Sequence, residues 1–128
     1  MVDRGTVSVL GIDHVQVAAP EGCEAEARAF YAGLLGLEEL PKPEALVGHG
    51  GAWFACGPHQ LHVGIEPEFA PARRAHPAFA VDGAERLTAL AARLGGAGVE
   101  VTWDDDIPGT ARFYASDPWG NRLEFTAV

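Results

Sequence analysis

An internal repeat constrains the fold of this chain more than any other feature of its sequence. His14 and His76 lie 62 positions apart, and His62 and Glu124 are separated by the same offset. A three-residue run beginning at Gly36 recurs at this offset, with a valine in place of the leucine. Several matches in one order are hard to obtain by chance, and repeats are informative before any motif is considered. The sequence therefore predicts two copies of one folding unit.

A second match involves aromatic residues. Trp53-Phe54-Ala55 corresponds to Phe113-Tyr114-Ala115 at an offset of 60, and Pro58 and Pro118 follow the two runs at the same distance. Because the offset returns to 62 afterwards, we expect the second hairpin turn to be two residues longer than the first. Residues 117–121 supply that longer turn, with the Asp, Pro, Gly and Asn that turns favour.

Glycine and proline divide the two halves into similar segments. In the first half a strand, a helix and further strands are predicted over residues 11–19, 23–35, 37–40, 46–49, 52–56 and 60–65. The second half repeats this order from His76, with a helix ending at Leu94 and strands over residues 99–103, 111–116 and 122–126. We expect an α+β fold in which two tandem βαβββ units form a curved mixed sheet around a pocket. The alternative is a plain α+β domain whose halves are similar by coincidence.

The length of 128 residues suits a single domain. We expect that domain to cover residues 1–128, with unit one at about 8–66, a linker at about 67–75 and unit two at about 76–128. The hydrophobic fraction of 48% is ordinary for a chain with a packed core. Disulfides are therefore not needed, and Cys23 and Cys56 suit a reducing compartment.

The formal net charge of −9 argues against nucleic acid and against anionic membrane surfaces as partners. Both bind proteins mainly through clustered Lys and Arg. The sequence also lacks the roughly 18 consecutive apolar residues of a membrane span and a secretory leader. A cytoplasmic protein with a small-molecule partner is the expectation that remains.

Polar side chains recur on one face of the predicted strands. Successive side chains of a strand point to opposite faces, so His14 and Gln16 share the face opposite to the apolar valines between them. The same alternation puts His62, His76 and Glu124 on the inner faces of their strands. Three imidazoles and a carboxylate form a ligand set for a divalent Zn, Mn, Fe, Co or Ni ion. Taken alone, each histidine fits a structural or surface role better than that of a ligand. The two pairs of repeat-related positions are what favour a metal site.

These residues resemble the vicinal-oxygen-chelate superfamily, which includes glyoxalase I, bleomycin-resistance proteins and extradiol dioxygenases. The resemblance covers residues 11–125. Its motifs are Gly-Ile-Asp-His-Val at residues 11–15, Phe30-Tyr31 ahead of Leu-Gly-Leu at residues 35–37, His76 at the start of the second unit, and the run at residues 113–124.

The resemblance implies a divalent metal held by the first and last strands of the two units. His14, His76 and Glu124 match the three positions that the superfamily uses most regularly, and His62 matches a fourth that varies. Glyoxalase I enzymes typically carry a glutamate at the position of His62, so we do not assign that reaction.

Two classes of function are therefore open. The first is a metal-dependent enzyme for a small oxygen-chelating substrate, with dioxygenase-like or lyase- or isomerase-like chemistry. Two histidines and one carboxylate are the ligands of non-haem Fe(II) oxygenases, which favours the dioxygenase. The second class is a binding protein without catalysis, as in the antibiotic-binding members, which generally lack the ligands retained in this chain.

Further residues are candidates for the pocket. Tyr114 and His62 are predicted to be catalytic, whereas Gln16, Phe54 and Arg112 are predicted to bind substrate. Superfamily members complete their site within one chain or across a two-fold dimer, and we expect a homodimer.

Overall fold

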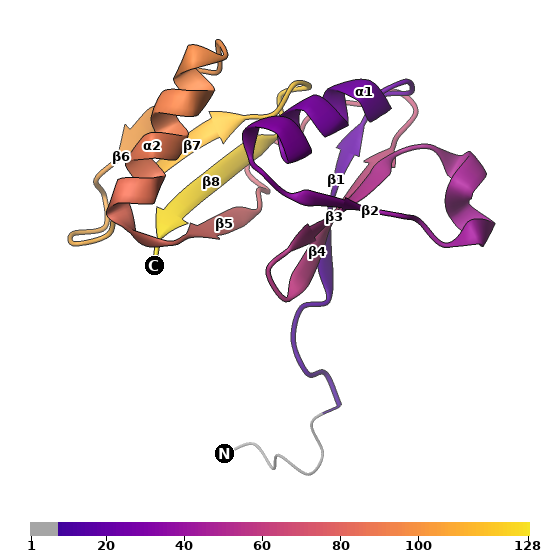
Figure 1. Ribbon diagram of the computed structural model, residues 1–128, viewed down its shortest axis with the longest axis horizontal. Coiled ribbons are helices and arrows are strands. Elements are labelled where there is room, and N and C mark those ends of the chain that lie inside the picture. Colours follow the sequence, from indigo (N-terminus) through magenta and orange to yellow (C-terminus); the bar gives the residue numbers. More distant parts are fainter. Residues whose placement is uncertain (1–7) are drawn as a thin grey trace.

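The computed structural model describes residues 8–128, and Figure 1 shows two sheets with their helices. The first unit contains β1 (His14–Ala19), α1 (Glu24–Ala27), η2 (Arg28–Leu34), β2 (Glu38–Leu40), η3 (Glu44–His49), β3 (Ala52–Cys56) and β4 (His59–Ile65). The second unit contains β5 (Ala78–Val81), α2 (Gly83–Gly96), β6 (Thr102–Asp104), β7 (Arg112–Ser116) and β8 (Arg122–Ala127).

The two units have the same topology. Their strand orders are β1-β4-β3-β2 and β5-β8-β7-β6, and in each sheet the first and last strands pair in parallel. Gln16 lies opposite His62 in the first sheet, and Ala78 lies opposite Glu124 in the second, so equivalent pairs are 62 positions apart. The predicted α+β fold of two βαβββ units is confirmed. The strands form two separate four-stranded sheets and not one closed barrel.

The aromatic match at an offset of 60 was wrong by one residue. Trp53 lies opposite His62, and Tyr114 lies opposite Glu124, which makes Trp53 and Tyr114 equivalent at an offset of 61. The second hairpin turn is therefore one residue longer by this register. A slip of one position exchanges the two faces of a strand. Phe54 therefore lies on the opposite face of β3 from Trp53, the equivalent of Tyr114.

Each unit buries one helix against one face of its sheet. In the first unit the α-helix continues as the π-helical turn η2, where Leu35 N–H donates to Phe30 O at 3.0 Å. The buried side chains of this helix are Ala27, Phe30 and Tyr31, and those of α2 are Leu87, Ala91 and Leu94. The core of each unit therefore lies between its helix and its sheet.

Equivalent glycines end the two helices. Gly36 has a φ of 78° and Gly98 a φ of 84°, a conformation that suits glycine at a helix C-terminus. The following N–H groups of Leu37 and Val99 donate back to Tyr31 O and Leu94 O at 2.9 and 3.0 Å. The predicted stop at Gly36 is confirmed.

Residues 46–49 are not a strand as predicted but belong to the 3-10 helix η3. The edge of the sheet next to β3 is taken by β2, so this short apolar run has no partner strand. None of the residues of η3 is buried, and Val47 is largely exposed. A short apolar run cannot be assigned from its pattern alone, because pairing decides its structure.

The units touch where the helix of the first meets the β7–β8 turn of the second (Figure 1). Tyr31 Oη donates to Asp117 Oδ2 at 2.8 Å, and Asn121 Nδ2 donates to Ala18 O at 2.7 Å. Between α2 and η2, Arg93 Nη2 donates to Gly33 O at 3.2 Å. The two sheets are therefore held side by side with their helices in contact.

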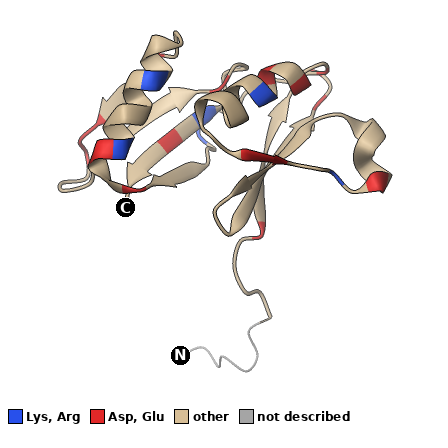
Figure 2. Ribbon diagram, in the orientation of Figure 1, with Lys and Arg blue, Asp and Glu red and all other residues tan. Residues whose placement is uncertain are grey.

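Charged residues are distributed over many elements. Figure 2 shows the lysines and arginines on separate strands and helices, interspersed with acidic residues. Among residues 8–128, no helix combines the length and the apolar run that a membrane crossing requires.

Candidate metal centre

The first sheet brings His14 and His62 together. His14 begins the edge strand β1, and His62 lies in the neighbouring strand β4. Their rings stack with centroids 4.2 Å apart. On its other side His62 stacks on Trp53 with centroids 3.9 Å apart and an interplanar angle of 3°. The three rings form one stack on the face of the sheet that carries no helix.

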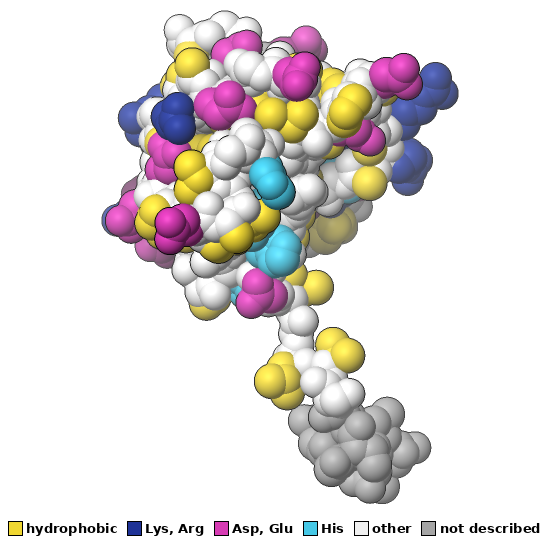
Figure 3. Space-filling model, turned by 90° about the vertical axis from the view of Figure 1, so that its right-hand side faces the viewer, with side chains coloured by type: hydrophobic (Ala, Val, Ile, Leu, Met, Phe, Trp, Pro, Cys, Tyr) yellow, Lys and Arg dark blue, Asp and Glu magenta, His cyan; other side chains and the backbone are white. Residues whose placement is uncertain are grey.

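Among residues 8–128, only one ring nitrogen of His14 has a hydrogen-bond partner. Its Nδ1 lies 2.9 Å from Asp13 Oδ2. An ionised carboxylate can only accept a hydrogen bond, so we assign the proton to Nδ1 of His14. Nε2 then carries a lone pair, which is the arrangement of carboxylate, histidine and metal common in metalloproteins. Figure 3 shows histidine side chains at the surface on one side of the molecule, one of them against an acidic side chain.

His62 is far less accessible than His14, with only 5% of its surface exposed. Burial lowers the pKa of His62 below its ordinary value, and the neighbouring His14 lowers it further. Its Nε2 lies 2.8 Å from Gln60 Oε1. The ring is therefore neutral near pH 7. Stacking fixes its position, and Nε2 is engaged by Gln60.

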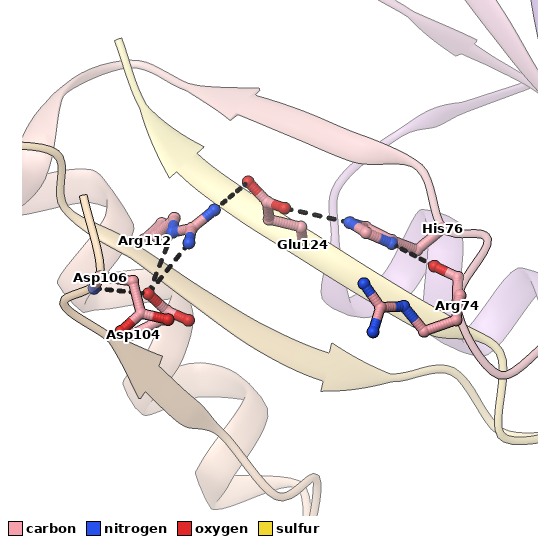
Figure 4. Close-up of polar contacts among 6 residues, drawn as sticks. All are labelled: Arg74, His76, Asp104, Asp106, Arg112 and Glu124. Carbon is pink, nitrogen blue, oxygen red and sulfur yellow. Dashed lines mark hydrogen bonds and ion pairs between the residues drawn. The ribbon is translucent and has the colours of Figure 1, made fainter.

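The second sheet brings His76 and Glu124 together (Figure 4). His76 Nδ1 lies 2.7 Å from Arg74 O, and a carbonyl only accepts, so Nδ1 carries a proton. His76 Nε2 faces Glu124 Oε1 at 3.1 Å. In the neutral ring two lone pairs would then face each other. A proton or a metal cation between them removes that repulsion, so the pair fits a cation site.

Glu124 is held by further neighbours. Arg112 Nη1 lies 3.5 Å from Glu124 Oε2. Burial raises the pKa of Glu124, but its contacts with His76 and Tyr114 and the charge of Arg112 outweigh it and bring the pKa below its ordinary value. The carboxylate therefore remains ionised well below neutral pH, as a metal ligand must be.

Tyr114 shares this face with Glu124. Its ring meets His76 edge-on with centroids 5.7 Å apart, and the guanidinium of Arg122 lies 4.2 Å above the ring centre. Desolvation raises the pKa of Tyr114, as do its hydrogen bond to Glu124 and that carboxylate's charge. The hydroxyl is therefore protonated at neutral pH.

The four predicted ligands lie in two pairs, one on each sheet. Within residues 8–128, no three His, Cys, Asp or Glu side chains come close enough to hold one metal ion. Each pair alone offers too few protein ligands for a closed transition-metal site. A complete centre requires the two pairs to meet.

The remaining sequence-predicted residues have different surroundings. Gln16 lies over Gly64 in the neighbouring strand, where an added Cβ would collide with its amide, so it shares the face of His14. Phe54 is fully buried on the helix side and stacks at an angle on Tyr31 at 5.7 Å. Phe54 is thus on the opposite face from His62, and its assignment to substrate binding rested on the one-residue register error.

Two residues near the centre were missed by sequence reasoning. Neither Trp53 nor Asp13 was assigned a role in the site, although Trp53 stacks on His62 and Asp13 contacts His14. The signal for Asp13 was its place directly before a candidate ligand. For Trp53 the signal was its match to Tyr114, which the wrong offset concealed.

A cavity of about 780 Å³ lies between η2 and strands β6 and β7. Tyr114 and Arg122 line it together with Phe30, Leu34 and Val99. None of the four predicted ligands lines this cavity, whereas Tyr114, which does line it, contacts His76 edge-on.

Comparison with known proteins supplies a family for this fold. The model of the Glyoxalase/Bleomycin resistance protein/Dioxygenase superfamily matches residues 11–125. A crystal structure of a protein assigned to the glyoxalase family, from Bacillus anthracis, shares 52% sequence identity and a TM-score of 0.89, with 94% of this chain and 97% of that chain covered.

More distant structures share the fold. Lactoylglutathione lyase from Agrobacterium tumefaciens has 22% identity and a TM-score of 0.73, covering 94% of this chain and 96% of its own. A mutant of the fosfomycin resistance protein FosX from Listeria monocytogenes, in complex with Mn(II) and 1S,2S-dihydroxypropylphosphonic acid, has 16% identity and a TM-score of 0.78. That match covers 93% of this chain and 92% of the FosX chain. No curated protein matches the sequence.

Proposed function

Because the chain belongs to the Glyoxalase/Bleomycin resistance protein/Dioxygenase superfamily, we propose that it is a divalent-metal-dependent enzyme for a small substrate with neighbouring oxygens. The proposal rests on the position of the ring proton in two histidines. His14 and His76 both bond an oxygen acceptor through Nδ1 and so present Nε2 as a lone pair, in one case directly toward Glu124. Imidazoles fixed in this way are suited to bind a metal.

His14, His76 and Glu124 would hold the ion. Their neutral imidazole nitrogens and carboxylate oxygen suit Fe, Mn, Zn, Co or Ni. When bound, the metal would act as a Lewis acid that polarises the chelating oxygens of the substrate. The superfamily supports this chemistry, because the FosX relative is in complex with Mn(II).

The centre is shared between two copies of the chain in this proposal. The two ligand pairs lie on separate sheets, and no three candidate ligands among the described residues converge within one chain. In a two-fold dimer, the first sheet of one protomer can face the second sheet of its partner, and the symmetry produces two equal centres. A homodimer of single-domain chains is therefore part of the proposed function.

Tyr114 and His62 would serve as proton donor and proton acceptor, respectively. Tyr114 keeps its proton at neutral pH because its pKa is raised, so it can donate a hydrogen bond or a proton to a substrate oxygen. His62 is neutral because its pKa is lowered, so it can accept a proton. Gln16 lies on the same face as His14 and would orient the substrate through its amide.

The reaction class follows from the number of protein ligands. His62 is packed between two rings and bonded to Gln60, which supports a role beside the metal and not as a fourth ligand. Two histidines and one carboxylate leave positions for substrate and dioxygen, so we favour a dioxygenase-type reaction. Coordination by His62 would favour a lyase- or isomerase-type reaction instead.

Mixing two defective variants tests the proposal. His14→Ala and Glu124→Ala each remove a ligand from every centre, so each dimer alone should lose most of its metal. After the two variants are mixed and re-equilibrated, about half of the dimers contain both, and each of these holds one intact centre. Metal analysis should then recover about a quarter of the wild-type content, because only one centre in four is intact.

Other outcomes separate the alternatives. Loss of metal in both variants without recovery on mixing would place the centre within one chain. Unchanged metal content in His14→Ala, His76→Ala and Glu124→Ala would contradict the ligand assignment. A wild-type protein that binds small molecules but no metal would instead be a binding protein without catalysis.

A further inference from the structure

We infer that Asp104 and Arg112 form a positioning pair that holds Glu124 in one orientation, with Oε2 engaged and Oε1 left toward His76. The inference rests on the proposed metal centre. It reassigns Arg112, which the sequence suggested as a substrate-binding residue. The contacts that carry it are drawn in Figure 4.

Asp104 fixes the guanidinium of Arg112. Arg112 Nη2 and Nε donate to Asp104 Oδ1 at 3.0 and 3.3 Å. The same Oδ1 accepts the backbone N–H of Asp106 at 2.8 Å, so the carboxylate itself is anchored in the turn that follows β6. A planar guanidinium held through two of its nitrogens has little freedom to rotate.

The register of the sheet aims Arg112 at Glu124. Asp104 lies directly opposite Arg112 in the β6–β7 pair, and Tyr114 lies opposite Glu124 in the β7–β8 pair. Arg112 is therefore diagonal to Glu124 on the same face, a spacing that long side chains can bridge. Its Nη1 lies 3.5 Å from Glu124 Oε2.

The three side chains are shielded from solvent. The exposed fractions are 13% for Arg112, 13% for Glu124 and 20% for Asp104. The two carboxylates take three of the five N–H donors of Arg112. Because only 13% of the side chain is exposed, a substrate anion has little access to the other two.

The two oxygens of Glu124 consequently have different roles. Oε2 faces Arg112 and Oε1 faces His76 Nε2, the atom that carries the free lone pair. Arg112 would thus favour a metal held through Oε1 alone. A monodentate carboxylate leaves one more position for the substrate than a bidentate one does.

The test measures metal binding by the purified, metal-free dimer with Co²⁺ alone. The variants are Arg112→Gln, Arg112→Lys and Asp104→Asn, and Asp105→Asn is the matched control in the same turn. We expect Arg112→Gln and Asp104→Asn to weaken Co²⁺ binding by about 10-fold to 100-fold, as loss of residues that orient ligands does. Arg112→Lys should recover part of the loss, and Asp105→Asn should bind as the wild type.

The visible spectrum of bound Co²⁺ gives a second readout, because it changes with coordination number. Arg112→Gln should alter this spectrum by allowing both oxygens of Glu124 to bind. The thermal midpoint of the metal-free variants shows whether Asp104 and Arg112 serve only to stabilise the β6–β7 pair. A lower midpoint with an unchanged Co²⁺ dissociation constant and spectrum would overturn the inference. A wild-type protein that binds no Co²⁺, Mn²⁺ or Zn²⁺ would overturn the proposed function as well.

Discussion

The hydroxyl of Tyr31 donates a hydrogen bond of 2.8 Å to Asp117 Oδ2, across 86 positions of sequence and between the two units. Asp117 is buried and also accepts hydrogen bonds from the backbone N–H groups of Trp119 and Asn121 and from Asn121 Nδ2. The run at residues 113–124, one of the motifs of the family resemblance, thus joins the units through its turn. Its role in this contact is structural.

Tyr31→Phe removes this hydrogen bond while keeping the ring. We expect it to lower the free energy of unfolding by about 2 kcal/mol, because the bond is buried and its acceptor is charged. Urea denaturation followed by circular dichroism measures the change. Thr88→Val is a control, since it removes an exposed hydroxyl on α2 and should change stability by less than about 0.5 kcal/mol. Equal midpoints for Tyr31→Phe and wild type would contradict a stabilising contact.

Gly51→Ala should be strongly destabilising. Gly51 has a φ of 80°, and an added Cβ would collide with the backbone carbonyl oxygen of Val63 in β4. A left-handed conformation alone costs an alanine about 1–2 kcal/mol, and a backbone atom cannot move aside easily. Gly48→Ala is the matched control, because an added Cβ meets nothing within 4 Å there. Similar thermal midpoints for the two variants would show that the β3–β4 pair tolerates displacement.

The pH dependence of stability should contain a contribution from Glu24. The hydrogen bond from the Gly51 N–H is the main cause that lowers the pKa of Glu24 below 4.5, with further help from the Cys23 thiol. A depressed pKa in the folded state stabilises the protein above the unfolded value. The stabilisation is therefore present above about pH 4.5 and is lost as the pH falls through the lower folded value.

Urea midpoints measured from pH 3 to 7 for wild type and Glu24→Gln check this expectation. The difference between the two proteins should be largest near neutral pH and should narrow below pH 4.5. Glu26→Gln, at an exposed position of the same helix, controls for the loss of one charge. A constant difference across this range would contradict the assignment.

His62→Ala should separate catalysis from metal binding. His62 is held by Trp53, His14 and Gln60 beside the proposed centre, so its loss should lower turnover much more than metal content. Loss of a direct ligand, as in His14→Ala, should lower both together. Metal analysis and turnover with a candidate substrate are compared for the two variants. Complete loss of metal in His62→Ala would make His62 a full ligand and favour lyase- or isomerase-type chemistry.

Much of the fold could be predicted because the repeat is visible in short-range sequence patterns. Gly36 and Gly98 end equivalent helices, and the alternation around His62 and Glu124 marks equivalent strands. These patterns depend on residues close in sequence, where backbone geometry and side-chain spacing leave few choices. The strand predicted at residues 46–49 was wrong because pairing, and not composition, decides a short run.

The sequence by itself determined the two βαβββ units and the polar residues on their open faces, since glycines, prolines and alternation act over a few residues. Tertiary structure alone decided which of those polar residues lie close together in space. It separated His14 and His62 from His76 and Glu124, because the relative placement of two sheets depends on long-range contacts such as that of Tyr31 with Asp117. It also turned Phe54 into the core and Trp53 toward His62, because a register shift of one residue reverses a strand's faces.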